Sequence, residues 1–254
     1  MRNDAINPNG LVGRECVHLQ QLRFRKQGGQ HVVDFVAFRG SHGCFGSRGR
    51  LAPHKLDAMN TPRGRALAQL TSVIEEYRQH ADIARLLEAL QAMAEATPTD
   101  ELFDAADAHA AIPEVLGPLM EVVVAREPQH ARALVRLASA YWLSGRGPET
   151  VGELASRAIA ADPSHRGAWH LWALTETEPR SRMTRWLQVT ERFPDDDLAR
   201  ANLADNAATV GTAEDDPVAL KLAIDTFGAL RRTAPHPAQR DALDKAIDAL
   251  RNRR

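Results

Sequence analysis

The stretch ARALVRLASAYWLSGRGPETVGELASRAIAADP, residues 131–163, carries the pattern that decides the fold. Leu134, Leu137 and Tyr141 fall on one face of a helix, because three or four positions separate each from the next. Gly145 follows where the chain must turn, and Pro163 ends the segment. The pattern predicts two helices joined by a tight turn, with a proline at the unit boundary.

The prolines show that this unit recurs. The segments VVVAREPQHARAL, AIAADPSHRGAW and VTERFPDDDLARA share a helix end, a proline, two polar residues and a new helix start. Intervals of 35, 31 and 41 residues separate the prolines of these segments and one later proline: Pro128, Pro163, Pro194 and Pro235. A period of about 34 residues is typical of helical arrays, in which each helix pair buries its apolar face against the next pair.

The best unit resembles the tetratricopeptide repeat family, whose first helix carries large, large, small and aromatic residues in fixed order. Leu134, Leu137, Ala138 and Tyr141 match that order. The resemblance covers about residues 98–254. It implies an all-α fold, a right-handed solenoid of helical hairpins.

The later units match the family less well. The second offers Trp169, Trp172 and Ala173, and we expect its turn between helices to be shortened. The third, DLARANLADNAATVG, keeps Leu203, Ala204 and Gly211, has Arg200 where the first large residue belongs, and is followed by an insertion, GTAEDD. Small residues are expected where helices approach most closely, namely Ala138, Ala158, Ala173 and Ala204.

Both ends of the helical region have expected structures. Residues 59–97 have helical periodicity with a phase shift near His80, which indicates either one long helix or a tight helical pair. After Pro98, Thr99 or Asp100 is expected to cap a helix, and Pro113 to begin another. The last helix, within 237–254, is expected to cap the array, since its apolar residues share one side: Ala242, Leu243, Ala246, Ile247 and Leu250.

Residues 1–58 differ from the rest in composition. They carry nine Lys/Arg against four Asp/Glu and eight of the sixteen glycines, whereas the remainder is acidic and rich in helix formers. LRFRKQGGQHVVDFVAF indicates a small β-hairpin turning at Gly28-Gly29, within a head that is otherwise weakly ordered. An alternative is that the true start is Met59 and the head is a misassigned extension.

Three of the four tryptophans lie within residues 169–186. Trp169 and Trp172 share one helix face, and Trp186 belongs to the following helix, so all three are expected to pack between helices. Trp142 follows the structural Tyr141 and is expected either to pack or to face a concave surface.

The sequence shows no known catalytic motif: it lacks a phosphate loop, a GxSxG elbow, an HExxH helix and a CxxC pair. The acidic runs at 195–197 and 214–216 are expected to cap helices rather than to bind metal. His165 and His170 lie five positions apart, which does not place two imidazoles above each other on a helix. We therefore predict no enzyme and no cofactor.

Two alternatives concern the head. Its Cys and His residues form the ligand set of a tetrahedral zinc site, although their spacing is unlike that of compact zinc fingers: Cys16, His18, His42 and Cys44. Arg23, Arg25 and Lys26 beside Phe24 suggest nucleic-acid binding, which the acidic body opposes. Neither is the favoured function.

By resemblance, the chain is expected to be a non-catalytic scaffold that binds a peptide or partner protein in a concave groove. The outward positions of its first helices are expected to line that groove: Arg132, Arg136, Ser139, Trp142, His170, Asn202 and Asp205. Two arginines near Trp142 would suit an acidic or aromatic peptide. A homo-oligomer is the alternative. No apolar run approaches the length of a membrane span, no signal peptide is present, and the expected location is the cytoplasm.

Overall fold

The computed structural model describes residues 23–27, 30–34 and 61–252. By its internal contacts the chain divides into two compact units, residues 1–48 and 49–254. Each unit is described here by itself.

The described part of the first unit is a two-stranded hairpin. Strands β1 (Arg23–Gln27) and β2 (Gln30–Asp34) are antiparallel, with Arg23 opposite Asp34 and Gln27 opposite Gln30. The sequence predicts this hairpin, and its Gly28-Gly29 turn lies outside the described residues.

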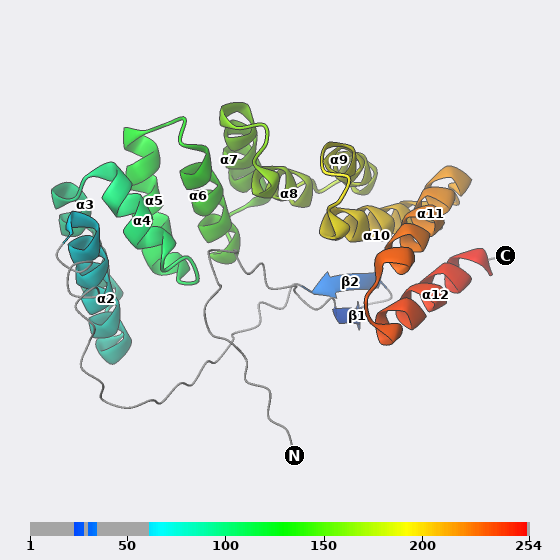
Figure 1. Ribbon diagram of the computed structural model, residues 1–254, viewed down its shortest axis with the longest axis horizontal. Helices are drawn as coiled ribbons and strands as arrows, with labels where there is room; N and C mark the ends of the chain where they lie inside the picture. Colours follow the sequence, from blue (N-terminus) through cyan, green and yellow to red (C-terminus); the bar gives the residue numbers. More distant parts are fainter. Residues whose placement is uncertain (1–22, 28–29, 35–60, 253–254) are drawn as a thin grey trace, which may run out of the picture. The chain divides into compact units, whose positions relative to one another are not determined.

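The described part of the second unit is entirely helical, and Figure 1 shows its helices following one another along the chain. Proline begins the second helix of each hairpin, where a missing N–H costs nothing. The helices are α2 (Pro62–His80), α3 (Ile83–Ala96), α4 (Thr99–Asp107), α5 (Pro113–Arg126), α6 (Ala131–Leu143), α7 (Pro148–Ala161), α8 (Arg166–Leu174), α9 (Pro179–Arg192), α10 (Asp197–Ala213), α11 (Pro217–Thr233) and α12 (Pro237–Arg251).

The helices pack as successive hairpins: α4 with α5, α6 with α7, α8 with α9, and α10 with α11. Neighbouring hairpins also contact each other, since α5 packs on α6, α7 and α6 on α8, and α9 on α10. The four small residues expected at close approaches are fully buried: Ala138, Ala158, Ala173 and Ala204. The fold is therefore a tetratricopeptide-like helical repeat, as the sequence predicts.

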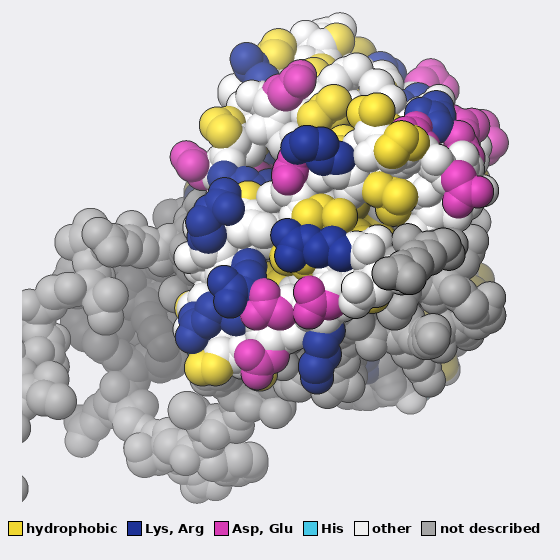
Figure 2. All heavy atoms as spheres, turned by 90° about the vertical axis from the view of Figure 1, so that its right-hand side faces the viewer, with side chains coloured by type: hydrophobic (Ala, Val, Ile, Leu, Met, Phe, Trp, Pro, Cys, Tyr) yellow, Lys and Arg dark blue, Asp and Glu magenta, His cyan; other side chains and the backbone are white. Residues whose placement is uncertain are grey.

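Helix α12 closes the array. It packs against α11 and buries Leu243 and Ile247, while Asp241, Lys245 and Asp248 are exposed. Figure 2 shows that the face at this end mixes basic, acidic and apolar side chains. A mixed surface of this kind suits an end that contacts water.

Several local expectations were wrong. The turn between α8 and α9 is not shortened, because Thr175–Glu178 has as many residues as Ser144–Gly147; instead α8 has nine residues, whereas α6 has thirteen. Thr99 and Asp100 do not cap α4: they lie in its first turn, and Pro98 is the capping residue.

Gly211 does not lie in a turn between helices, where the repeat pattern predicts it. It lies inside α10, which extends through the first half of the GTAEDD insertion to Ala213, rather than in a turn like Gly145. A Cβ at Gly211 would lie 2.7 Å from the backbone N of Leu220. Glycine is therefore required here by the close approach of α10 and α11.

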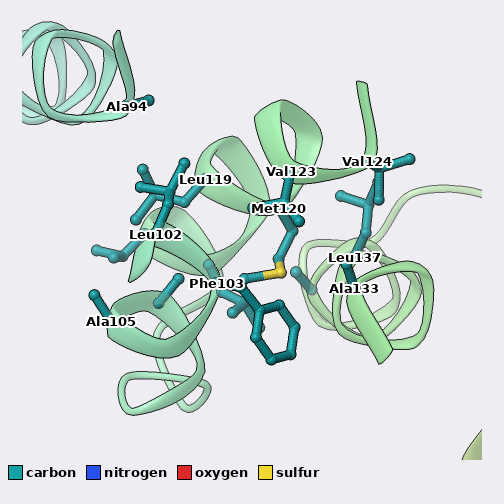
Figure 3. Packing of buried hydrophobic residues seen from close by; sticks show 14 of the residues in the cluster. Ala94, Leu102, Phe103, Ala105, Leu119, Met120, Val123, Val124, Ala133 and Leu137 are labelled. Atoms are coloured by element: carbon teal, nitrogen blue, oxygen red, sulfur yellow. The ribbon is translucent and has the colours of Figure 1, made fainter. Parts of the chain in front are cut away.

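The buried apolar residues include two separate clusters. The larger runs from α2 to the start of α8 and is mainly aliphatic; Figure 3 shows Met120 of α5 directed toward Phe103 of α4, with Leu137 of α6 beside Val124. The smaller joins α8, α9 and α10 around Trp186, which is 2% exposed. Trp169 and Trp172 are partly buried against it with their rings edge to face, 5.6 Å apart.

Candidate functional site

The two arginines predicted for the groove share one carboxylate of their own chain. Arg136 Nε donates to Asp107 at the end of α4, and Arg132 Nη2 lies 3.5 Å from the other oxygen of the same carboxylate. The Arg132 guanidinium also lies over the Phe103 ring, 4.8 Å from its centroid. These contacts join α4 to α6 and partly neutralise the arginines, which the sequence pattern did not indicate.

Ser139 and Trp142 continue the same helix with different roles. The Ser139 hydroxyl donates to the Val135 carbonyl at 2.8 Å, so its hydrogen is used within α6. The Trp142 side chain is 40% exposed at the end of α6, and the next residue, Leu143, is 63% exposed. Trp142 is thus available to a partner, whereas Ser139 offers only its oxygen lone pairs.

The Tyr141 ring fixes this end of α6. Its hydroxyl donates to Glu121 Oε1 at 2.6 Å, and the Arg146 guanidinium lies 4.4 Å from the ring centroid. Burial, followed by the hydrogen bond to Glu121, raises the pKa of Tyr141 to about 12. Tyr141 therefore stays protonated and holds α5 beside α6.

His170 is a link between hairpins. Its Nε2 lies 2.8 Å from Asp196 Oδ2, and its ring lies 5.6 Å from that of Trp186. Asp196 caps α10 by accepting from the N–H groups of Leu198 and Ala199. Desolvation opposes ionisation of this buried carboxyl, but hydrogen bonds from His170 and Ala199 hold its pKa below the usual value. The contact ties α8 to the first turn of α10.

Asn202 and Asp205 lie on α10, a helix whose middle part has no exposed residue. No residue from 198 to 212 is exposed, so every side of this helix is at least half covered. The Asn202 amide donates to the Leu198 carbonyl, and the Thr209 hydroxyl donates to the Asp205 carbonyl. Burial raises the pKa of the Asp205 carboxyl to about 7. No hydrogen bond or ion pair within the described residues joins Asn202 or Asp205 to the candidates on α6.

Sequence analysis missed a cleft of about 590 Å³ along α9. Arg185 lies over the Trp172 ring at 4.6 Å and pairs with Glu176, while Arg180 bridges Glu214 and Asp216. The four arginines of α9 give a weak sequence signal, because arginine spacing alone does not show which carboxylates will face them. The cleft is open to solvent, and its arginines already have acidic partners.

The remaining predicted sites gain no structural support. Cys16, His18, His42 and Cys44 lie outside the described residues. In the part of the chain that is described, no three His, Cys, Asp or Glu side chains are grouped to hold a metal ion. Within the same ranges, no helix is both long and apolar enough to cross a membrane.

Comparison with solved structures finds helical-repeat proteins. A MamA structure is 14% identical with a TM-score of 0.48, and the alignment covers 68% of this chain and 98% of MamA. A thermophilic TPR protein from Thermus thermophilus is 15% identical with a TM-score of 0.44, covering 73% of this chain and 98% of that one. No family model and no curated protein matches the sequence. The helix pairing described above is what makes this fold tetratricopeptide-like.

Proposed function

We propose that this chain is a non-catalytic scaffold that binds a peptide or protein segment along the outward face of the first helices α6, α8 and α10. The observation that carries the proposal is the burial pattern of α8 and α10. Residues on sides other than the one that faces the stack are also half-buried. Ala173 and Ala204 face the stack and are fully buried. Away from them, His170, Asn202 and Asp205 are half-buried rather than exposed, as expected for residues lining a concave surface.

Trp142 gives this face an aromatic group at its α6 end. Partly exposed tryptophans are favourable binding residues, because a rigid ring supplies a large contact area with little loss of side-chain entropy. The paired Arg132 and Arg136 are held in place by Asp107, so a partner would meet them already oriented. The face therefore combines an aromatic anchor with fixed polar groups.

Site-specific photocrosslinking in the native host tests this function. A photoreactive phenylalanine replaces Trp142 in the full chain, and the matched control places it at Leu67, an exposed apolar residue of α2. We expect one or a few discrete adducts from position 142 and none of the same mass from position 67. Equal adduct patterns at both positions, or none at 142, would contradict the proposal.

Self-association is a second candidate function, favoured by apolar exposure at the α2–α3 end. Leu67, Ile83 and Leu87 are large apolar side chains with more than a third of their surface exposed. Ile83 and Leu87 lie four positions apart on α3, so their exposed side chains share one helix face, and exposed apolar patches are typical of protein contacts. Sedimentation velocity over a range of concentrations tests this: Ile83→Asp with Leu87→Asp is expected to shift a dimer to monomer, and a wild-type chain that is monomeric throughout rules it out.

A further inference from the structure

Asp205 differs from the other covered acidic side chains near it in having no partner. Asp196 binds His170 and two backbone N–H groups, Asp216 binds Arg180, and Glu176 binds Arg185. Among the hydrogen bonds and ion pairs of the described residues, none involves the Asp205 carboxylate. The carboxylate is nevertheless half-buried on α10.

The polar neighbours of Asp205 on its own helix do not compensate it. Asn202 and Thr209 lie about one turn to either side, and each donates a hydrogen to a backbone carbonyl, at 2.9 Å in both cases, rather than to the Asp205 carboxylate. Burial raises the pKa of the Asp205 carboxyl to about 7, and no ion pair within the described residues involves this carboxylate. An unpaired carboxylate that is partly removed from water opposes folding.

The arginines of adjacent segments are already engaged elsewhere. Arg182 of α9 bonds to Asn206 and to the Glu176 carbonyl, and Arg166 of α8 lies beside Asp196. Arg200 of α10 bonds to Asp197 and to the Pro194 carbonyl. The described chain thus supplies no counter-charge to Asp205, whereas it does supply one to Arg132 and Arg136.

We propose that Asp205 is the position at which a bound peptide segment places a cationic side chain, lysine or arginine. This inference rests on the proposed function and specifies its partner: the α10 end of the binding face selects positive charge. At the α6 end, Asp107 is paired with both arginines, so among the acidic groups of the face Asp205 is the one whose carboxylate has no ion-pair partner within the described residues. A buried group without its partner is typical of recognition sites, where the ligand completes the pairing.

A displayed library of random peptides, selected on the full chain, tests the inference. We expect enriched peptides to share a Lys or Arg at one position and to bind Asp205→Asn at least tenfold more weakly than wild type. Asp195→Asn removes an exposed carboxylate just before α10 and is expected to bind like wild type. A circular dichroism melt of each variant checks that the fold is retained.

Charge exchange separates recognition from a structural effect. Asp205→Lys is expected to lose the selected peptides and to regain binding when their conserved basic residue is changed to Glu. Peptides that lack a shared basic residue, or that bind Asp205→Asn as well as wild type, overturn the inference. If such peptides still compete with the Trp142 crosslink, the scaffold function stands and only the role of Asp205 fails; if no peptide is enriched, both fail.

Discussion

The two apolar clusters of the helical unit are stabilised in different ways. The α2–α8 cluster is mainly aliphatic, with fully buried residues such as Leu102, Leu119 and Val123. The α8–α10 cluster has a tryptophan at its centre and polar links around it, including His170 with Asp196 and Arg182 with Asn206. Repeat arrays of one topology can thus use either aliphatic packing or aromatic packing with hydrogen bonds.

The short helix α8 explains where the clusters divide. Its Ala168 belongs to the first cluster and its Ala173 to the second, so one nine-residue helix is shared between both. A short helix buries less surface than a long one, and Trp169 and Trp172 supply area that its length does not. Arg185 adds a contact by lying over Trp172 and donating to its carbonyl at 2.7 Å. We therefore expect the packing of α8 against its neighbours to be the least stable helix packing in the described array.

The largest expected effect comes from Trp186→Ala. Removing the central ring leaves a cavity and takes away the contact with His170, so the free energy of unfolding is expected to fall by about 3–5 kcal/mol. Urea denaturation measures the loss, and hydrogen exchange locates it. Protection should fall mainly in α8–α10, whereas Met120→Ala should affect mainly α4–α6. Equal losses along the whole array in both variants would show that the two clusters act as one cooperative unit.

Gly211→Ala is the next largest. The new Cβ would meet Leu220 at 2.7 Å from its backbone N and 2.8 Å from its Cγ, so α11 must move. We expect a loss of about 2–3 kcal/mol in the free energy of unfolding, although alanine normally favours a helix over glycine. Gly228→Ala in α11 is the matched control, because its Cβ would have no neighbour closer than 4.0 Å. That variant should melt at or above the wild-type temperature; a destabilised Gly228→Ala would remove the packing explanation.

The sequence predicts the helices better than it predicts their contacts. Proline positions and small residues depend on local geometry, so Pro113 at a helix start and Ala138 at a close approach are both found as expected. The Gly211 contact arises from the α10–α11 crossing, which a pattern within one helix does not contain.

The sequence also does not predict which side chains the candidate site residues contact. Arg132 and Arg136 were identified as outward positions, but their pairing with Asp107 joins residues far apart in the chain. His170 is expected from the pattern to line the groove, and the structure adds its contact with Asp196, which the pattern does not indicate. For Asp205 the informative property is the absence of a partner within the described residues, which depends on the neighbours of α10 in space. Periodicity indicates a face, and only tertiary structure shows which charges on it are compensated.

Asp205→Asn should stabilise the chain by an amount that grows with pH. Burial raises the folded-state pKa to about 7 from a reference of 3.8, so between these values the folded state holds a proton that the unfolded state has released. This carboxyl therefore makes folding progressively less favourable as pH rises from about 4 to about 7. We expect Asp205→Asn to stabilise the chain by about 1–2 kcal/mol at pH 8, after allowing for its partial exposure, and by almost nothing below pH 4.

Thermal melts of wild type and Asp205→Asn across this pH range check the prediction. Asp196 gives the opposite sign, because its lowered pKa stabilises the fold above the unfolded value and that contribution is lost on acidification. A pH-independent difference between wild type and Asp205→Asn would mean that this carboxyl is not destabilised by burial.

The smallest expected effects concern two histidines that occupy the N-cap positions of α6 and α8. His130, the N-cap of α6, accepts the Ala133 N–H through Nδ1 at 3.2 Å, whereas His165, the N-cap of α8, has a buried Nδ1 with no hydrogen-bond partner within the described residues. His130→Ala should therefore lower the free energy of unfolding by about 1 kcal/mol. At His165, aspartate should act as Asp196 does in the next unit and accept two N–H groups, so His165→Asp is expected to raise stability by roughly 0.5–1 kcal/mol. Denaturant titrations at neutral pH measure both changes. If His165→Asp lowers stability, ring packing rather than capping determines the residue at the start of α8.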